Sequence, residues 1–226
     1  MGGTGKARLT HQFNDSPRTM MQTVDLSYRY AQTDVLANLS FDIPSGVTLV
    51  QGGDGRGKTT LLRLLAGDLK LQSGRVSVTP VPGGLTSQEQ IDSYRKQVFW
   101  VDPRSTAHDP ISARTYLDQQ SDLWPSFDHQ GLPALIEGLS LAEFLDKPLY
   151  MLSTGSKRKV WLAAAFTSHA AVALLDDPFA ALDKPSIRFV ADVLRGLAKQ
   201  SERAVVITGY AAPDNLLLGG LIDLGE

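Results

Sequence analysis

Residues 46–67 constrain the fold of this chain more than any other stretch. GVTLVQ (46–51) is a continuous apolar run, typical of a buried strand in a parallel sheet. A glycine-rich segment, GGDGRG (52–57), follows it, and KTTLLRLLAG (58–67) then places leucines on the core-facing side of a helix that Gly67 would end. A buried strand, a glycine-rich turn and an amphipathic helix in this order predict a phosphate-binding loop in an α/β protein.

The chemistry of this loop follows from its residue types. GGDGRGKTT matches the pattern G-x-x-x-x-G-K-[ST]. Glycines let backbone amides curl around phosphate oxygens, and the helix N-terminus adds partial positive charge. Lys58 would reach the β and γ phosphates, and the Thr59 hydroxyl would bind Mg²⁺. An ordinary glycine-rich turn is the alternative, which motif and context together disfavour. The predicted nucleotide-binding residues here are Gly52, Gly53, Asp54, Gly55, Arg56, Gly57, Lys58, Thr59 and Thr60.

A second apolar run, AVALL (171–175), ends in two carboxylates, Asp176 and Asp177. A strand of this kind would leave Asp176 at the edge of the sheet beside the phosphate loop, where it would be the second Mg²⁺ ligand. Asp177 stands where a general base for hydrolysis is expected. A helix-capping role would explain Asp176 alone, but not its pairing with a phosphate loop.

Composition narrows the class of protein further. The chain has 226 residues, a formal net charge of −2 and no cysteine, so neither a general nucleic-acid binder nor a disulfide-stabilised domain is expected. No apolar run is long enough to span a bilayer. We therefore expect a soluble, cytoplasmic protein with no nucleic-acid partner.

The remaining pattern gives the domain plan. Residues 1–20 are rich in small polar residues and predict a flexible tail, with one domain over 21–226. Alternating runs at 22–30 and 37–43 predict antiparallel strands. Short helical patterns between prolines and glycines predict a helical subdomain inserted at about 103–156, in which Ser140 and Glu143 would form a capping box. Apolar strands joined through helices predict a mostly parallel core sheet.

One more motif points to a family. LSTGSKRK (152–159) precedes the Asp176 strand by one helix and resembles the LSGGQ signature of ATP-binding cassette (ABC) ATPases; Ser153 and Gly155 match. Ser153 can cap a helix whose exposed amides form an anion site. The basic residues 157–159 are expected to form the solvated face of that helix; attraction of phosphate charge at the dimer interface is the alternative. The resemblance extends from about residue 22 to about residue 208, and DDPFAALDK (176–184) is further similar to the ATPase subunits of haem exporters used in cytochrome c maturation.

The resemblance implies a function and its partners. In this family two ATP molecules lie between two head-to-tail subunits, so Ser153 and Gly155 would bind the nucleotide of a second ABC ATPase subunit. Tyr30 falls where the family stacks an aromatic ring on adenine; Tyr28 is a weaker candidate, and a plain strand aromatic is the alternative. AALD (180–183) resembles the loop that contacts the partner subunit. The family further implies an integral-membrane permease as partner and a cytoplasmic location, peripheral on the inner face of the cell membrane.

Three positions depart from the family pattern. The catalytic glutamate is Asp177, the glutamine that senses Mg²⁺ and the permease is Asp102 (with a one-residue shift possible), and the switch histidine is Gly209. The histidines present are expected to be surface residues. We therefore expect ATP and Mg²⁺ binding with slow hydrolysis, in a transporter subunit. The alternative is a degenerate, non-hydrolysing regulatory subunit paired with an active ATPase. Homodimer and heterodimer both stay open.

Overall fold

The structure is a computed structural model that describes residues 18–79, 88–199 and 202–225. Its central sheet has five parallel strands in the order β5-β6-β7-β3-β8. This confirms the predicted buried strands. Strand β7 lies between β3 and β6. The segment after β7 therefore lies between the predicted phosphate loop, which follows β3, and the two carboxylates that follow β6. The strands are β3 (Gly46–Gln51), β5 (Val98–Trp100), β6 (Val172–Leu175), β7 (Ala204–Gly209) and β8 (Gly220–Asp223).

A second, antiparallel sheet confirms the predicted β-subdomain. It has the order β2-β1-β4, with β1 at Thr19–Tyr30, β2 at Thr33–Pro44 and β4 at Ser73–Val78. Strand β1 begins at Thr19, inside the predicted flexible tail (1–20). It begins there because Met20 and Met21 are buried in the core. The rest of the predicted tail, residues 1–17, lies outside the described residues.

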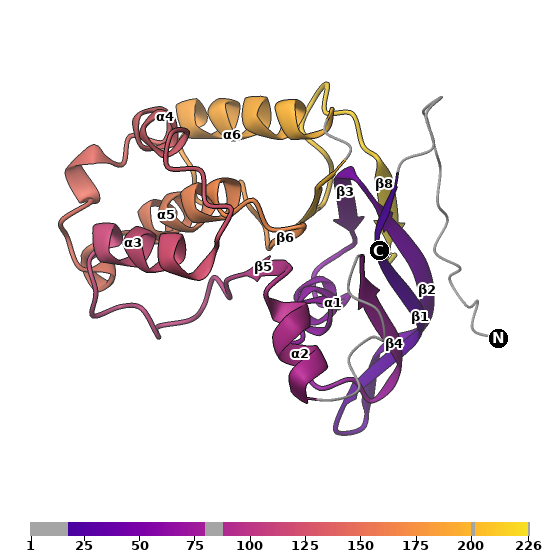
Figure 1. Cartoon of the computed structure of the whole chain (residues 1–226). Helices are drawn as coiled ribbons and strands as arrows, with labels where there is room; N and C mark the ends of the chain where they lie inside the picture. The colour runs from indigo at the N-terminus through magenta and orange to yellow at the C-terminus, as the bar shows by residue number, and fades with distance from the viewer. Residues whose placement is uncertain (1–17, 80–87, 200–201, 226) are drawn as a thin grey trace.

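Helices lie on both sides of the central parallel sheet (Figure 1). Helix α1 (Lys58–Leu65) follows β3, and α2 (Gln88–Arg95) precedes β5. Figure 1 shows the helices between β5 and β7 on the side away from the antiparallel strands. No helix in the described ranges is long and apolar enough to cross a membrane. The helices on that side are α3 (Ala113–Leu123), α4 (Leu132–Gly138), the 3-10 turns η1 (Ala142–Phe144) and η2 (Leu149–Met151), α5 (Thr154–Thr167) and α6 (Lys184–Leu197).

The apolar strands divide the core into two clusters. In β6, Ala173 and Leu175 pack with the helical side, whereas Val172 and Leu174 pack with α1 and the antiparallel sheet. Successive side chains of a strand point to opposite faces, so a strand buried on both faces must be apolar throughout. This explains why the run from Val172 to Leu175 contains no polar residue before the carboxylates.

The predicted capping box at Ser140 is wrong. Ser140 has a φ of 53°, and its amide and that of Leu141 donate to Glu137 and Ile136 carbonyls at the end of α4. The following turn, η1, has Leu141 at its N-cap and no side-chain cap. Ser140 therefore ends one helix rather than starting the next, because a three-residue turn leaves no first helical turn to cap.

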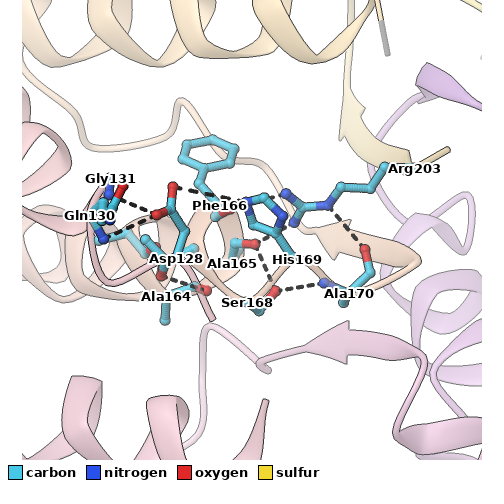
Figure 2. Close-up of polar contacts among 12 residues, drawn as sticks. Asp128, Gln130, Gly131, Ala164, Ala165, Phe166, Ser168, His169, Ala170 and Arg203 are labelled. Carbon is cyan, nitrogen blue, oxygen red and sulfur yellow. Dashed lines mark hydrogen bonds and ion pairs between the residues drawn. The ribbon is translucent and has the colours of Figure 1, made fainter. Parts of the chain in front are cut away.

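Arg203 fixes the end of α5 to the start of β7 (Figure 2). Its guanidinium is buried and donates to the carbonyls of Ala165, Phe166 and Ala170 at 2.7, 3.0 and 3.0 Å. Burial lowers the pKa of Arg203 to about 10. The last carbonyls of a helix have no partners within it, so this side chain satisfies groups that would otherwise be unpaired.

Candidate nucleotide site

The predicted phosphate loop connects β3 to α1 and forms one wall of a groove of about 510 Å³. Gly57 has a φ of 87°, and a Cβ there would lie 2.7 Å from the Val35 side chain, so only glycine fits. Gly52 and Gly53 do not line the groove. The groove is lined by Tyr30, Val35, Asp54, Gly55, Arg56, Gly57, Lys58, Thr59, Thr60, Pro103, Arg104, Thr154, Arg158, Asp176 and Asp177.

Lys58 is folded back onto its own loop. Its Nζ donates to the carbonyl oxygens of Gly52 and Gly53 at 2.5 and 2.8 Å. These bonds hold the ammonium group against the backbone of the phosphate loop. An anionic ligand in the groove would offer that ammonium a charged acceptor in place of two neutral carbonyls.

Tyr30 and Tyr28, the two candidates for contact with a base, lie in different places. Tyr30 is 44% exposed and lines the groove, whereas Tyr28 lines a separate hollow on the antiparallel sheet. The two rings pack edge to face, with centroids 5.0 Å apart. Of the two, Tyr30 is therefore the ring that can reach a ligand in the groove.

The two predicted Mg²⁺ ligands are in direct contact. The Thr59 hydroxyl donates to Asp176 Oδ2 at 2.7 Å, and the Thr208 hydroxyl donates to Asp176 Oδ1, also at 2.7 Å. A hydroxyl and a carboxylate are hard oxygen donors that suit Mg²⁺ when phosphate oxygens and water complete the shell. The donor set therefore fits the metal. Thr208 was missed from the sequence because only the strand order, with β7 beside β6, brings it to Asp176.

Asp177 lies beside this pair, with its carboxylate in the groove. Its φ is 51°, a conformation that Asp adopts more readily than most residues, and its amide donates to Thr208 Oγ1 at 2.8 Å. Desolvation raises the pKa of Asp177, and the neighbouring Asp176 raises it further, while Arg158 and Lys58 oppose the shift. A carboxylate with a raised pKa is a stronger proton acceptor.

The start of α5 is packed against the loop after Asp177. Ser153 caps the helix by accepting a 3.1 Å hydrogen bond from the Ser156 amide, as predicted. A Cβ on Gly155 would lie 2.2 Å from the Ala181 carbonyl oxygen, so the two segments touch at a position that requires glycine. Neither Ser153 nor Gly155 lines the groove, although Thr154 between them does.

Comparison with known proteins decides the family. The model of the ABC transporter family matches residues 36–180. This chain belongs to the ABC transporter ATP-binding family. It is 32% identical over 169 residues to the cytochrome c biogenesis ATP-binding export protein CcmA of Legionella pneumophila, covering 74% of this chain and 82% of that protein. A CcmA protein of Salmonella paratyphi A is 32% identical over 198 residues, with coverage of 84% and 89%.

Solved structures agree with this assignment. An ABC transporter ATP-binding protein from Pyrococcus furiosus superposes with a TM-score of 0.72 at 25% identity, covering 91% of this chain and 98% of that one. ATP, normally with Mg²⁺, is the ligand of the ABC ATPase family. The predicted P-loop architecture, with a parallel core and an antiparallel β-subdomain, is confirmed.

The basic run after the signature is not a solvated face. Lys157 forms a 2.5 Å ion pair with Asp109, and Lys159 forms one of 2.5 Å with Asp183. Arg158 donates to the Ala180 carbonyl and lines the ABC cassette's groove. Burial lowers the pKa of Arg158, and the two neighbouring carboxylates oppose this. The expectation of a solvated face is therefore wrong, because each of these side chains is at least partly buried and pairs with an acceptor on another segment of the chain.

Two altered family positions lie near the groove. Gly209 ends β7, and a Cβ there would meet only the Ala211 backbone, no closer than 3.5 Å, so a side chain would fit. Asp102 accepts from the Arg104 amide at 2.9 Å and lies just before the lining residues Pro103 and Arg104. In the part of the chain that the structure describes, no histidine lines the groove; His11 lies outside it.

Proposed function

We propose that this chain is a slowly hydrolysing ATP-binding subunit that powers a separate membrane permease through ATP-driven dimerisation. The observation that carries the proposal is the groove itself. It gathers Lys58, Thr59, Asp176 and Asp177, while Gly209 offers no side chain at its edge. The groups for binding are thus complete, and those for hydrolysis are reduced.

In this account the chain's residues act in sequence. The base of ATP lies against Tyr30, and the loop amides surround its phosphates. Lys58 leaves the Gly52 and Gly53 carbonyls and pairs with phosphate oxygens. Thr59 and Asp176 hold Mg²⁺, which neutralises phosphate charge when bound. Asp177 then takes a proton from the attacking water.

Two departures from the family make the reaction slow. Asp177 is one methylene shorter than glutamate, which sets its carboxylate back by about 1 Å, and a misplacement of that size can cost about 10²-fold in rate. General-base assistance is itself worth about 10²- to 10⁴-fold. Gly209 also removes a polar contact to the γ-phosphate. Neither change affects the groups that hold the ground state.

Dimerisation would complete each site. Ser153 and Gly155 of one subunit would close on the phosphates held by the other, since the N-terminus of a helix such as α5 carries partial positive charge. The cassette would then work at the inner face of the cell membrane on its permease. The names of its CcmA relatives support an export role, with the cargo recognised by the permease.

A second candidate is the degenerate regulatory subunit. Asp177, Gly209 and Asp102 favour it, because all three depart from the family pattern in one chain. Thr59 and Asp176 oppose it, because their contact keeps the Mg²⁺ ligands in place.

The test separates binding from dimerisation. Calorimetry should detect Mg·ATP binding by the wild type and its loss in Lys58→Ala. Sedimentation should detect an ATP-dependent dimer. Ser153→Asp keeps a helix cap but adds a charge that repels the partner's phosphate, whereas Ser153→Asn keeps the cap without that charge. We expect Ser153→Asp alone to lose the dimer while still binding ATP as a monomer. A wild type that binds no ATP would contradict the proposal.

A further inference from the structure

Tyr210 joins the end of β7 to the phosphate loop. Its hydroxyl donates to Asp54 Oδ1 at 2.5 Å, across 156 residues of sequence. Its ring centroid lies 5.0 Å from Lys58 Nζ, within cation–π range. The strand order explains the contact: β7 lies directly beside β3, so the residue after β7 reaches the loop that follows β3.

Asp54 poses an electrostatic problem for a loop of this kind. It is an exposed carboxylate that lines the groove, and a bound triphosphate would bring several negative charges close to it. A free carboxylate at this position would repel the ligand that the loop amides attract. A neighbouring group that donates a hydrogen bond to the Asp54 carboxylate would keep it away from the phosphates and reduce this repulsion.

We propose that Tyr210 is a positioning residue of the ATP site, whose hydroxyl holds the Asp54 carboxylate aside so that the phosphate loop can accept a polyphosphate. This inference rests on the proposed function, since it assumes that the loop binds ATP. The hydroxyl is suited to the role because a phenol is a hydrogen-bond donor at neutral pH, and its hydrogen bond to Asp54 raises the pKa of Tyr210 further. The direct partners of Tyr210 are Asp54 and Lys58 rather than the two carboxylates after β6, although the charge of Asp177 also raises the pKa of Tyr210.

The experiment is a double-mutant cycle on nucleotide affinity. Tyr210→Phe keeps the ring over Lys58 and removes only the hydroxyl, whereas Asp54→Asn removes the charge that the hydroxyl restrains. Calorimetry would give Kd for Mg·ATP and Mg·ADP in the wild type, both single variants and the double variant. Tyr210 is 66% exposed, so Tyr210→Phe should leave the thermal midpoint without nucleotide unchanged.

The expected pattern is specific. Tyr210→Phe weakens Mg·ATP binding by about tenfold, because the released Asp54 carboxylate repels the phosphates. The loss is smaller for Mg·ADP, which carries less charge. In the Asp54→Asn background the same substitution changes Kd by less than about twofold, because the charge that needs restraint is absent.

Three results would overturn the inference. Tighter ATP binding by Tyr210→Phe would make the contact an obstruction. An equal loss with and without the Asp54 charge would mean that the hydroxyl acts on the phosphates directly. If the wild type itself binds no ATP, the proposed function fails and the inference fails with it. If the wild type binds ATP but the effects of the two substitutions on Kd are simply additive, only the inference is refuted.

Discussion

Thr59 and Asp176 lie 117 residues apart in the sequence, yet the Thr59 hydroxyl donates a 2.7 Å hydrogen bond to Asp176 Oδ2. The contact joins the first turn of α1 to the residue after β6, and the Thr208 hydroxyl donates to the other carboxylate oxygen. The proposal that these residues hold Mg²⁺ with ATP leads to the first prediction.

Asp176→Asn should lower the apparent affinity for Mg²⁺ in the presence of ATP by about 100-fold, since it removes the only charged ligand of the pair. Thr208→Val keeps the volume and removes the hydroxyl that orients Asp176, so a loss of about tenfold is expected. Titration of Mg²⁺ at fixed ATP measures both. Unchanged Mg²⁺ affinity in Asp176→Asn would contradict the assignment.

The dependence of ATP turnover on pH tests the role of Arg158. A general base must be ionised, so turnover rises with pH through the pKa of Asp177, which lies above the ordinary carboxyl value. Arg158 lowers that pKa, so Arg158→Met should move the acidic limb of the profile to higher pH, while Arg158→Lys moves it less. A limb that stays in place or moves to lower pH would show that Arg158 does not act on Asp177.

Gly209→His should raise turnover. The backbone at Gly209 has room for a side chain, and the missing histidine would restore a polar contact to the γ-phosphate. One such contact is worth about 10²- to 10³-fold in rate, so a gain of about tenfold is expected in a site that did not evolve with it. Gly209→Ala is the matched control, with a Cβ but no donor. Equal rates in both variants would mean that this position does not limit hydrolysis.

Much of this site follows from local sequence. The strand, glycine-rich turn and helix at 46–67 are adjacent in the chain, so apolar runs and leucine spacing suffice to predict them. Ser153 could also be predicted as a helix cap, because the helix that it caps begins at the next residue.

The rest depends on strand order. Thr208 and Tyr210 reach the site only because β7 lies between β3 and β6, and no local pattern encodes that order. The basic run at 157–159 was expected to be solvated, but its acceptors lie 22–48 residues away. The Ser140 capping box failed because a local motif was outweighed by the end of the preceding helix.

The contacts of Asp183 predict that the free energy of unfolding falls at acid pH. It caps α6 through the Ser186 amide and pairs with Lys159, whose side chain is 9% exposed. The hydrogen bond from Lys159 is the main cause that lowers the pKa of Asp183. A lowered folded-state pKa gives stability that is present above about pH 4, the unfolded carboxyl value, and lost as pH falls below it.

Asp183→Asn keeps a helix cap and removes the charge. It should lower the free energy of unfolding at pH 7 by about 1 kcal/mol, since the carboxylate is half exposed. The variant should also lose less stability than the wild type between pH 4 and 2, a range set by the ordinary carboxyl pKa of about 3.9. Urea unfolding at several pH values measures both effects. Parallel pH curves for the two proteins would contradict this account.

The most direct test of the central claim is steady-state ATP turnover by the wild type and by Asp177→Asn, at saturating Mg·ATP and with binding measured separately. Asn is the suitable substitution because it tolerates the positive φ of Asp177 and keeps the shape of the side chain. The account predicts slow turnover by the wild type, a further loss of about 10²-fold in Asp177→Asn, and ATP binding by both. Equal turnover by the two proteins would show that Asp177 is not the base and would contradict the mechanism proposed here.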